Sequence, residues 1–109
     1  MAIEHAIPGQ VVDVGPLGSR LAEHRSTALF KSTDLEVMRL VLPAGASLPP
    51  HKVSGEITIQ CIEGSIDVSA GGRSHRLHAG QLLYLSGDAV HGVRAIDDAS
   101  ALVTVALRK

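Results

Sequence analysis

The sequence predicts an all-β domain, a sandwich or a barrel, and three observations support this. Short runs of β-forming residues recur along the chain, and Gly, Pro or Asp separates each run from the next. The breaks come roughly every 8 to 12 residues, a spacing typical of all-β sandwiches and barrels. No helical pattern alternates with the runs, which argues against a parallel α/β sheet. The length of 109 residues suits one domain.

Residues 1–27 are expected to form an N-terminal arm, and residues 28–109 a barrel. Within the arm, residues 10–14 suit an edge strand, and residues 16–26 suit a short helical turn that begins near Pro16. The runs of the barrel and the residues that end them are, in order, 35–42 (Pro43 to Gly45), 57–62 (Glu63 and Gly64), 65–69 (Ala70 to Gly72), 74–77 (Ala79 and Gly80), 81–85 (Ser86 to Asp88), 90–96 (Asp97 and Asp98) and 100–107.

The composition narrows the class of protein. Apolar residues make up 45% of the chain, with no Trp, one Tyr and one Phe, so the core must be aliphatic. A net charge of −1 without a run of Lys or Arg argues against nucleic acid as a partner. No apolar stretch approaches the roughly 20 residues that span a bilayer, and the first residues do not resemble a secretory signal. A single cysteine, Cys61, suits a reducing compartment, so a cytoplasmic location is expected.

The alternation of residues indicates which side chains point inward. In residues 56–62 the odd positions are apolar and the even positions carry Glu56, Thr58 and Gln60. Successive side chains of a strand point to opposite faces, so the odd set should line the core. His91 shares a face with Val93 and Ala95, whereas Arg94 lies on the opposite face. The residues expected to line one aliphatic pocket are His51, Val53, Ile57, Ile59 and His91.

The spacing of glycines and histidines resembles the two motifs of the cupins, G-x5-H-x-H-x3-E-x6-G and G-x5-P-x-G-x2-H-x3-N. Gly45, His51 and Gly64 match the first motif, and Gly80 and His91 match the second. The resemblance covers roughly residues 28–107. It implies a double-stranded β-helix, the jelly-roll barrel of small RmlC-like cupins, and a homodimer, as open strand edges also suggest.

The metal set that the resemblance implies is incomplete. In the family the metal ligands are two histidines and a glutamate of the first motif and the histidine of the second motif. In this sequence Val53 stands at the place of the second histidine and Ile57 at the place of the glutamate. Sites for Fe, Mn, Ni or Zn normally need three or four protein ligands. A bulge before Glu56 could turn this carboxylate inward as a third ligand. Cys61 could also serve, although a lone buried cysteine is usually inert.

The sequence leaves three functions open. The leading hypothesis is a cupin that binds a small molecule and has an incomplete or unconventional metal site. The alternative is a metal-dependent enzyme of the dioxygenase or isomerase type, with His51 and His91 as ligands. The third is a structural or interaction module without a ligand. Arg39 is expected on a solvated or subunit face, Tyr84 in the core or an interface, and His75 and His78 at the surface.

Overall fold

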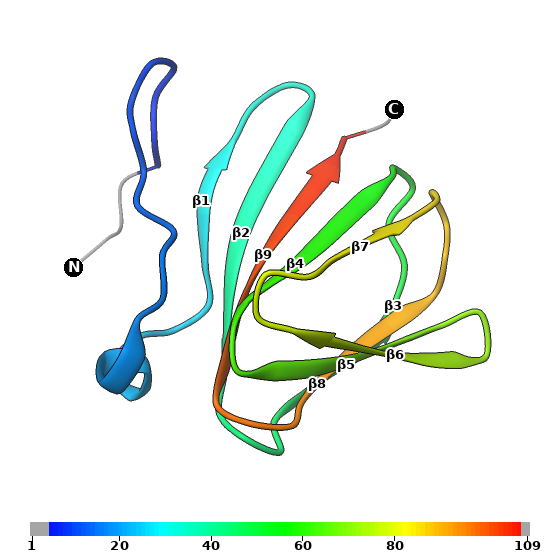
Figure 1. Ribbon diagram of the computed structural model, residues 1–109. Coiled ribbons are helices and arrows are strands. Elements are labelled where there is room, and N and C mark those ends of the chain that lie inside the picture. Colours follow the sequence, from blue (N-terminus) through cyan, green and yellow to red (C-terminus); the bar gives the residue numbers. More distant parts are fainter. Residues whose placement is uncertain (1–4, 108–109) are drawn as a thin grey trace.

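The structure is a computed structural model and describes residues 5–107. Its strands form two antiparallel sheets that face each other around an aliphatic core (Figure 1). The elements are the 3₁₀ helix η1 (Gly18–Glu23) and the strands β1 (Thr27–Lys31), β2 (Leu35–Leu42), β3 (Ser47–His51), β4 (Ile57–Glu63), β5 (Ser65–Ala70), β6 (Arg73–His78), β7 (Leu82–Leu85), β8 (His91–Ala95) and β9 (Ala99–Ala106). Within the described range no helix is long and apolar enough to cross a membrane.

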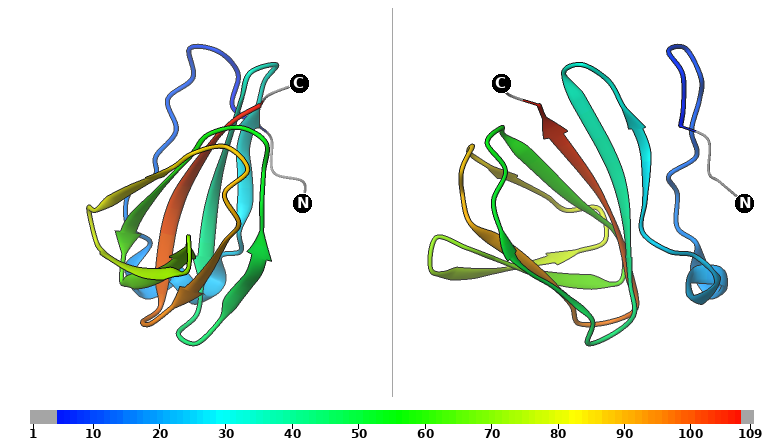
Figure 2. Two further views of the ribbon diagram at one scale, coloured as in Figure 1. Left: turned by 90° about the vertical axis from the view of Figure 1, so that its right-hand side faces the viewer. Right: turned by 180° about the vertical axis from the view of Figure 1, so that it is seen from behind.

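The two sheets have different sizes. The larger has the strand order β1-β2-β9-β4-β7 and the smaller has the order β3-β8-β5-β6. Chain neighbours such as β2 and β3 therefore lie in different sheets, as the views in Figure 2 show. This arrangement confirms the predicted all-β jelly-roll fold.

The core confirms the predicted alternation. Ile57, Ile59 and Cys61 are 3%, 1% and 0% exposed, whereas Glu56 is exposed. On β8, His91 and Val93 are buried and Arg94 is exposed. β4 and β8 thus each place one set of side chains between the sheets, and burial of aliphatic surface is the main stabilising contribution to the fold.

Two strands of the structure were not predicted from the sequence, and one predicted strand does not form. β3 contains Pro49 and Pro50, which lower its β-propensity, but it pairs only with β8 at a sheet edge, where proline is tolerated. β1 has a register shift between Ala28 and Phe30, which hides its alternation. Residues 10–14 are not a strand, and this prediction was wrong. The predicted helical turn is present as η1.

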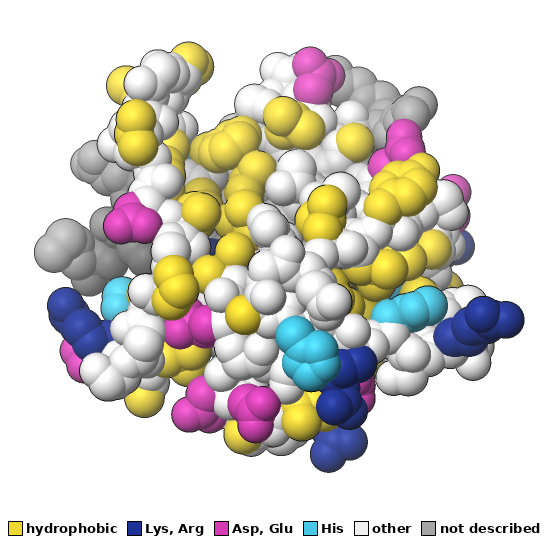
Figure 3. Space-filling model, in the orientation of Figure 1, with side chains coloured by type: hydrophobic (Ala, Val, Ile, Leu, Met, Phe, Trp, Pro, Cys, Tyr) yellow, Lys and Arg dark blue, Asp and Glu magenta, His cyan; other side chains and the backbone are white. Residues whose placement is uncertain are grey.

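The N-terminal arm runs beside β1 and leaves a hollow next to it. The backbone N–H of Ala6 donates to the carbonyl of Leu29 at 2.8 Å. Beyond this contact the arm stands away from the sheet, and a cavity of about 350 Å³ separates it from Phe30 and Lys31. The hollow and the hydrophobic side chains along it are visible in Figure 3. The arm therefore leaves apolar surface of this sheet open.

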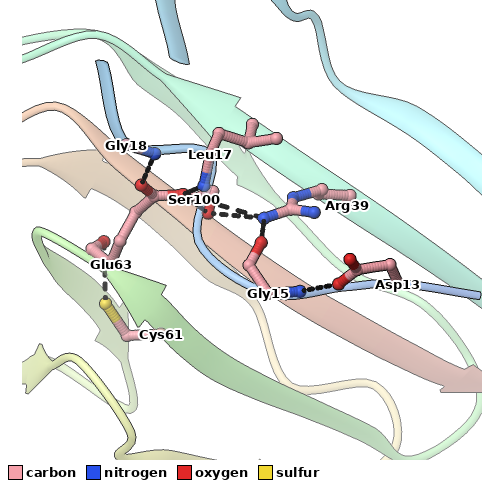
Figure 4. Close-up of polar contacts among 8 residues, drawn as sticks. All are labelled: Asp13, Gly15, Leu17, Gly18, Arg39, Cys61, Glu63 and Ser100. Carbon is pink, nitrogen blue, oxygen red and sulfur yellow. Dashed lines mark hydrogen bonds and ion pairs between the residues drawn. The ribbon is translucent and has the colours of Figure 1, made fainter. Parts of the chain in front are cut away.

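A buried polar cluster fixes the other end of the arm to the barrel (Figure 4). The carboxylate of Glu63 accepts the backbone N–H groups of Leu17 and Gly18, both at 2.9 Å, and the hydroxyl of Ser100. Arg39 donates to the carbonyl of Gly15, and its Nη2 lies 3.7 Å from Glu63 Oε2. Arg39 is only 7% exposed, so its expected place on a solvated or subunit face was wrong: the arm covers it.

The cluster also perturbs the ionisation of Glu63. Burial by itself would raise the pKa of this carboxyl, because it disfavours the charged form. The N–H groups of Leu17 and Gly18, the Ser100 hydroxyl and the Arg39 guanidinium all favour the carboxylate, and together they lower the pKa of Glu63 below its ordinary value. The ionised carboxylate is thus the form that holds the arm.

Candidate functional site

A small cavity lies between the two sheets and reaches the surface beside β3. Its volume is about 60 Å³, and its lining is aliphatic except for two histidines. All five residues that the sequence analysis assigned to a pocket line it. The complete lining is Met38, Leu40, Leu48, His51, Val53, Ile57, Ile59, His91, Val93, Val103 and Val105.

The two histidines form a cross-strand pair. His51 ends β3 and His91 begins β8, and the two residues are register partners. Their ring centroids are 4.5 Å apart and the ring planes are inclined by 53°. His91 is 2% exposed, whereas His51 is exposed, so the pair connects the inner cavity with the surface.

Backbone carbonyls orient both imidazoles. His91 Nδ1 lies 3.0 Å from the carbonyl oxygen of Ala89, and His51 Nδ1 lies 3.3 Å from that of Pro49. A carbonyl oxygen only accepts, so each Nδ1 is the donor in these contacts. In the neutral imidazole this assignment leaves Nε2 as an acceptor for a ligand. The neutral form of each imidazole therefore has one acceptor nitrogen left, and both histidines line the same apolar cavity.

The residues present do not fit the family's metal. The places of the other two ligands carry Val53 and Ile57, whose side chains line the cavity and offer no donor atom. Among residues 5–107, no group of three or more His, Cys, Asp or Glu side chains is arranged to hold a metal ion. Two imidazoles fall short of the three or four protein ligands that divalent transition metals normally require.

Neither of the two residues considered as a third metal ligand, Glu56 and Cys61, lies with the histidine pair. Glu56 is exposed and accepts a hydrogen bond from the Tyr84 hydroxyl, which raises the pKa of Tyr84. Cys61 is fully buried, and its sulfur donates to the carbonyl of Glu63 at 3.4 Å. Burial raises the pKa of the Cys61 thiol, which disfavours the thiolate that a metal would need. Tyr84, expected in the core or an interface, is 59% exposed in this chain.

A shallow vestibule adjoins the inner cavity. It has a volume of about 130 Å³ and shares Met38, Val53 and Val105 with the cavity. Glu36 and Ser54 add polar groups to its wall. Neither Glu36 nor Ser54 was expected at the site from the sequence: Glu36 lies there because β2 pairs with β9, and Ser54 lies in the loop between β3 and β4.

Known proteins that are similar to this chain indicate its family. The family model described as a Cupin domain matches residues 38–107. No curated protein matches the sequence. Among solved structures, a conserved protein of unknown function from Streptococcus pyogenes superposes with a TM-score of 0.77 at 17% identity, covering 100% of this chain and 96% of that one. An RmlC-like cupin from Desulfovibrio desulfuricans has a TM-score of 0.70 at 25% identity, covering 97% of each chain.

A third solved structure covers less of the chain. A cupin superfamily protein from Desulfitobacterium hafniense has a TM-score of 0.73 at 14% identity, covering 76% of each chain. The residues that match the Cupin domain model, 38–107, include β4, β5, β8 and β9, which lie in the interior of the two sheets. The fold that this chain shares with the solved structures therefore agrees with the family match.

Proposed function

Because the chain belongs to the cupin-domain family, we propose that it binds a small molecule between its sheets and that its metal site is incomplete. The observation that carries this proposal is the His51–His91 pair at one end of an otherwise apolar cavity. Apolar pockets with a few convergent polar groups are the usual form of small-molecule sites. Val53 and Ile57 make the cavity apolar where the family pattern has donor atoms.

The orientation of the histidines favours one class of ligand. With Nδ1 donating to a carbonyl, each neutral imidazole offers Nε2 as an acceptor. The partner should therefore carry a hydroxyl or amino group. Glu36 and Ser54 in the vestibule also suit a group that donates hydrogen bonds. We infer a small, largely apolar alcohol, phenol or amine.

The volume limits the size of the ligand. Pockets for drug-sized ligands measure about 300–1,000 Å³, whereas the inner cavity measures about 60 Å³ and the vestibule about 130 Å³. A water molecule takes about 30 Å³ of liquid volume. The inner cavity thus suits a group of a few heavy atoms, and the rest of the ligand would occupy the vestibule.

Thermal unfolding in the presence of small ligands tests the proposal. The panel contains cyclohexanol, phenol and benzylamine, with benzoate as a compound that lacks a donor. A ligand at 100 times its Kd stabilises the native state by about 2.7 kcal/mol, which raises the Tm of a domain of this size by several degrees. We expect at least one donor ligand to give such a shift and benzoate to give none.

Substitutions test whether the ligand binds in the cavity between the sheets. Ile59→Phe should fill the cavity and abolish the shift, and His51→Ala should reduce it without loss of the fold, because His51 is exposed. His75→Ala, on the other end of the smaller sheet, serves as the control and should leave the shift unchanged. If no panel member stabilises the wild type, or if the shift survives both site variants, the cavity is not the binding site.

A further inference from the structure

One wall of the inner cavity is held by fewer contacts than the others. Four of the strands that line the cavity, β2, β4, β8 and β9, pair with a neighbour on both sides, whereas β3 pairs with β8 alone. The same wall continues into the connection between β3 and β4, where Val53 also lines the cavity. We call residues 49–55 the flap. We propose that the flap opens to admit the ligand and that the turn of residues 86–89 holds it closed.

Two prolines weaken the pairing of the flap with β8. Pro49 and Pro50 have no N–H group to donate to the neighbouring strand, and the register between β3 and β8 shifts over the same stretch, between Leu48 and His51. None of the five residues of β3 is buried. Segments with few hydrogen bonds and little buried surface open locally at a lower free energy than the core. The flap is therefore the part of the cavity wall that we expect to open first.

The 86–89 turn supplies the contacts that keep the flap closed. Within residues 5–107, the one backbone hydrogen bond of residues 52–55 runs from the N–H of Asp88 to the carbonyl of Val53, at 2.8 Å. Gly87 packs against the same segment, since a Cβ atom there would lie 2.3 Å from the carbonyl oxygen of Ser54. The connection of β3 to β4 and that of β7 to β8 thus lie side by side (Figure 1).

The backbone conformation of Asp88 is unusual. Its φ is 64°, and among the described residues no other residue except glycine has a positive φ. Asp and Asn tolerate this left-handed region better than other residues with a side chain. Backbone outliers of this kind persist where the surrounding structure requires them, often at binding sites and switches. Here the outlier carries the N–H group that binds the flap.

The same turn connects the flap to the histidine pair. The carbonyl of Ala89 accepts from His91 Nδ1 at 3.0 Å, and His51 ends β3 on the flap, with its ring centroid 4.5 Å from that of His91. A closed flap therefore brings both imidazoles to the cavity, and an open flap removes one of them. Val53 lines both the inner cavity and the vestibule, so its displacement would join the two volumes. This role rests on the proposed function for its ligand, whereas the movement can be measured without one.

The reactivity of a cysteine in the cavity measures opening of the flap. Val103 is 4% exposed and lines the inner cavity but not the vestibule. Val103→Cys in a Cys61→Ala chain places a single thiol there, because the sequence has one cysteine. The native chain, whose Cys61 is 0% exposed and does not line the cavity, reports opening of the core. The reagent is methyl methanethiosulfonate without denaturant, and each rate is divided by that of the same thiol in urea. We expect the cavity thiol to react at least about tenfold faster than Cys61, because local opening requires less free energy than unfolding.

Substitutions in the 86–89 turn should raise the rate of the cavity thiol selectively. Gly87→Ala places a methyl group against the flap and should speed labelling at Val103→Cys on the order of tenfold, with less than about a twofold change at Cys61. Asp88→Ala, which disfavours a positive φ, should act in the same direction. Asp88→Asn tolerates this conformation and should leave both rates unchanged. The two Asp88 variants keep the test decisive if Gly87→Ala does not fold.

The ratio of the two labelling rates decides between a flap and general unfolding. Gly72→Ala, in the turn between β5 and β6, is the control, because its added Cβ would contact nothing, and it should leave this ratio unchanged. Equal rates for the two thiols in the chain with an unaltered turn would mean that the cavity opens only with the core and that there is no flap. Equal acceleration of both thiols by the turn variants would mean that the turn only stabilises the fold. Because no ligand takes part, failure of the proposed function would show separately, as the absence of a Tm shift with the ligand panel.

Discussion

His51 and His91 are register partners on β3 and β8, with ring centroids 4.5 Å apart, and the side chains next to them in the cavity are aliphatic. The family's motif spacing has therefore kept a pair of imidazoles together without the carboxylate that would complete a metal site. The Nδ1 of each imidazole donates to a backbone carbonyl two residues earlier in the chain, which orients the ring.

Restoring the missing donors should create a metal site. In the variant Val53→His with Ile57→Glu, four donor side chains would surround the cavity, as divalent metals require. We expect this variant to bind one Zn²⁺ or Ni²⁺ per chain by isothermal titration, and Zn²⁺ to raise its Tm. Without metal it should be less stable than the wild type, because Ile57 is 3% exposed and a carboxylate there would be unpaired.

The control for this design adds His51→Ala to the same double variant. Its affinity for Zn²⁺ should fall steeply, since one ligand is lost. A double variant that folds and gains no metal would show that Val53 and Ile57 do not point to the histidine pair.

The arm should depend on the ionised carboxylate of Glu63. Glu63→Gln removes the negative charge that faces Arg39 and the N–H groups of Leu17 and Gly18. Hydrogen bonds to charged groups contribute about 1.5–3 kcal/mol each, so we expect urea unfolding at pH 7 to show a loss of about 2 kcal/mol. Asp67→Asn, which breaks a more exposed ion pair, should cost less than about 1 kcal/mol. Equal losses for the two variants would contradict a buried anchor.

The contribution of Glu63 should also depend on pH with a definite sign. Its pKa is lowered in the folded state, so its stabilisation is fully present above the unfolded-state pKa and is lost as the pH falls toward the folded-state pKa. The stability difference between wild type and Glu63→Gln should therefore stay constant above about pH 5.5 and shrink below about pH 4.5, near the usual pKa of glutamate. A difference that grows on acidification would contradict this sign.

Gly64 should tolerate no side chain. It has φ 71°, and a Cβ atom there would lie 2.2 Å from the carbonyl oxygen of Asp98. Both strain at positive φ and the clash with backbone should destabilise Gly64→Ala by more than about 1 kcal/mol in urea unfolding. Gly72→Ala is the control, because φ is 75° but no atom lies within 4 Å of the added Cβ. If both variants lose the same stability, the clash contributes nothing.

Cys61 should be inert in the folded protein. It is fully buried, and burial raises the pKa of its thiol. Because the thiolate is the reactive form, we expect a thiol-specific reagent at pH 8 to label Cys61 only as fast as the chain opens, and labelling to become rapid in urea. Fast labelling without denaturant would mean that β4 is accessible in the native state.

Much of the fold could be predicted because alternation reports which face of a strand is buried. Ile57, Ile59 and Cys61 alternate with polar residues, and this pattern also pointed His51 and His91 inward. β3 was not predicted because Pro49 and Pro50 lower its β-propensity, although proline is tolerated in an edge strand.

The rest depended on contacts between distant parts of the chain. Met38 and Val105 reach the cavity through the pairing of β2 with β9, which no local pattern specifies. Arg39 is buried because the arm folds over it, and its own strand gives no sign of this.

Elemental analysis of the untagged protein, purified without chelators, tests most directly whether the histidine pair works without a metal. The matched sample is the double variant His51→Ala His91→Ala, with His51→Ala alone in case the double variant does not fold. We expect well below one equivalent of Fe, Mn, Ni or Zn per chain in the wild type and no difference between samples. Near-stoichiometric metal that disappears with His51 would contradict it and would assign the pair to a metal centre.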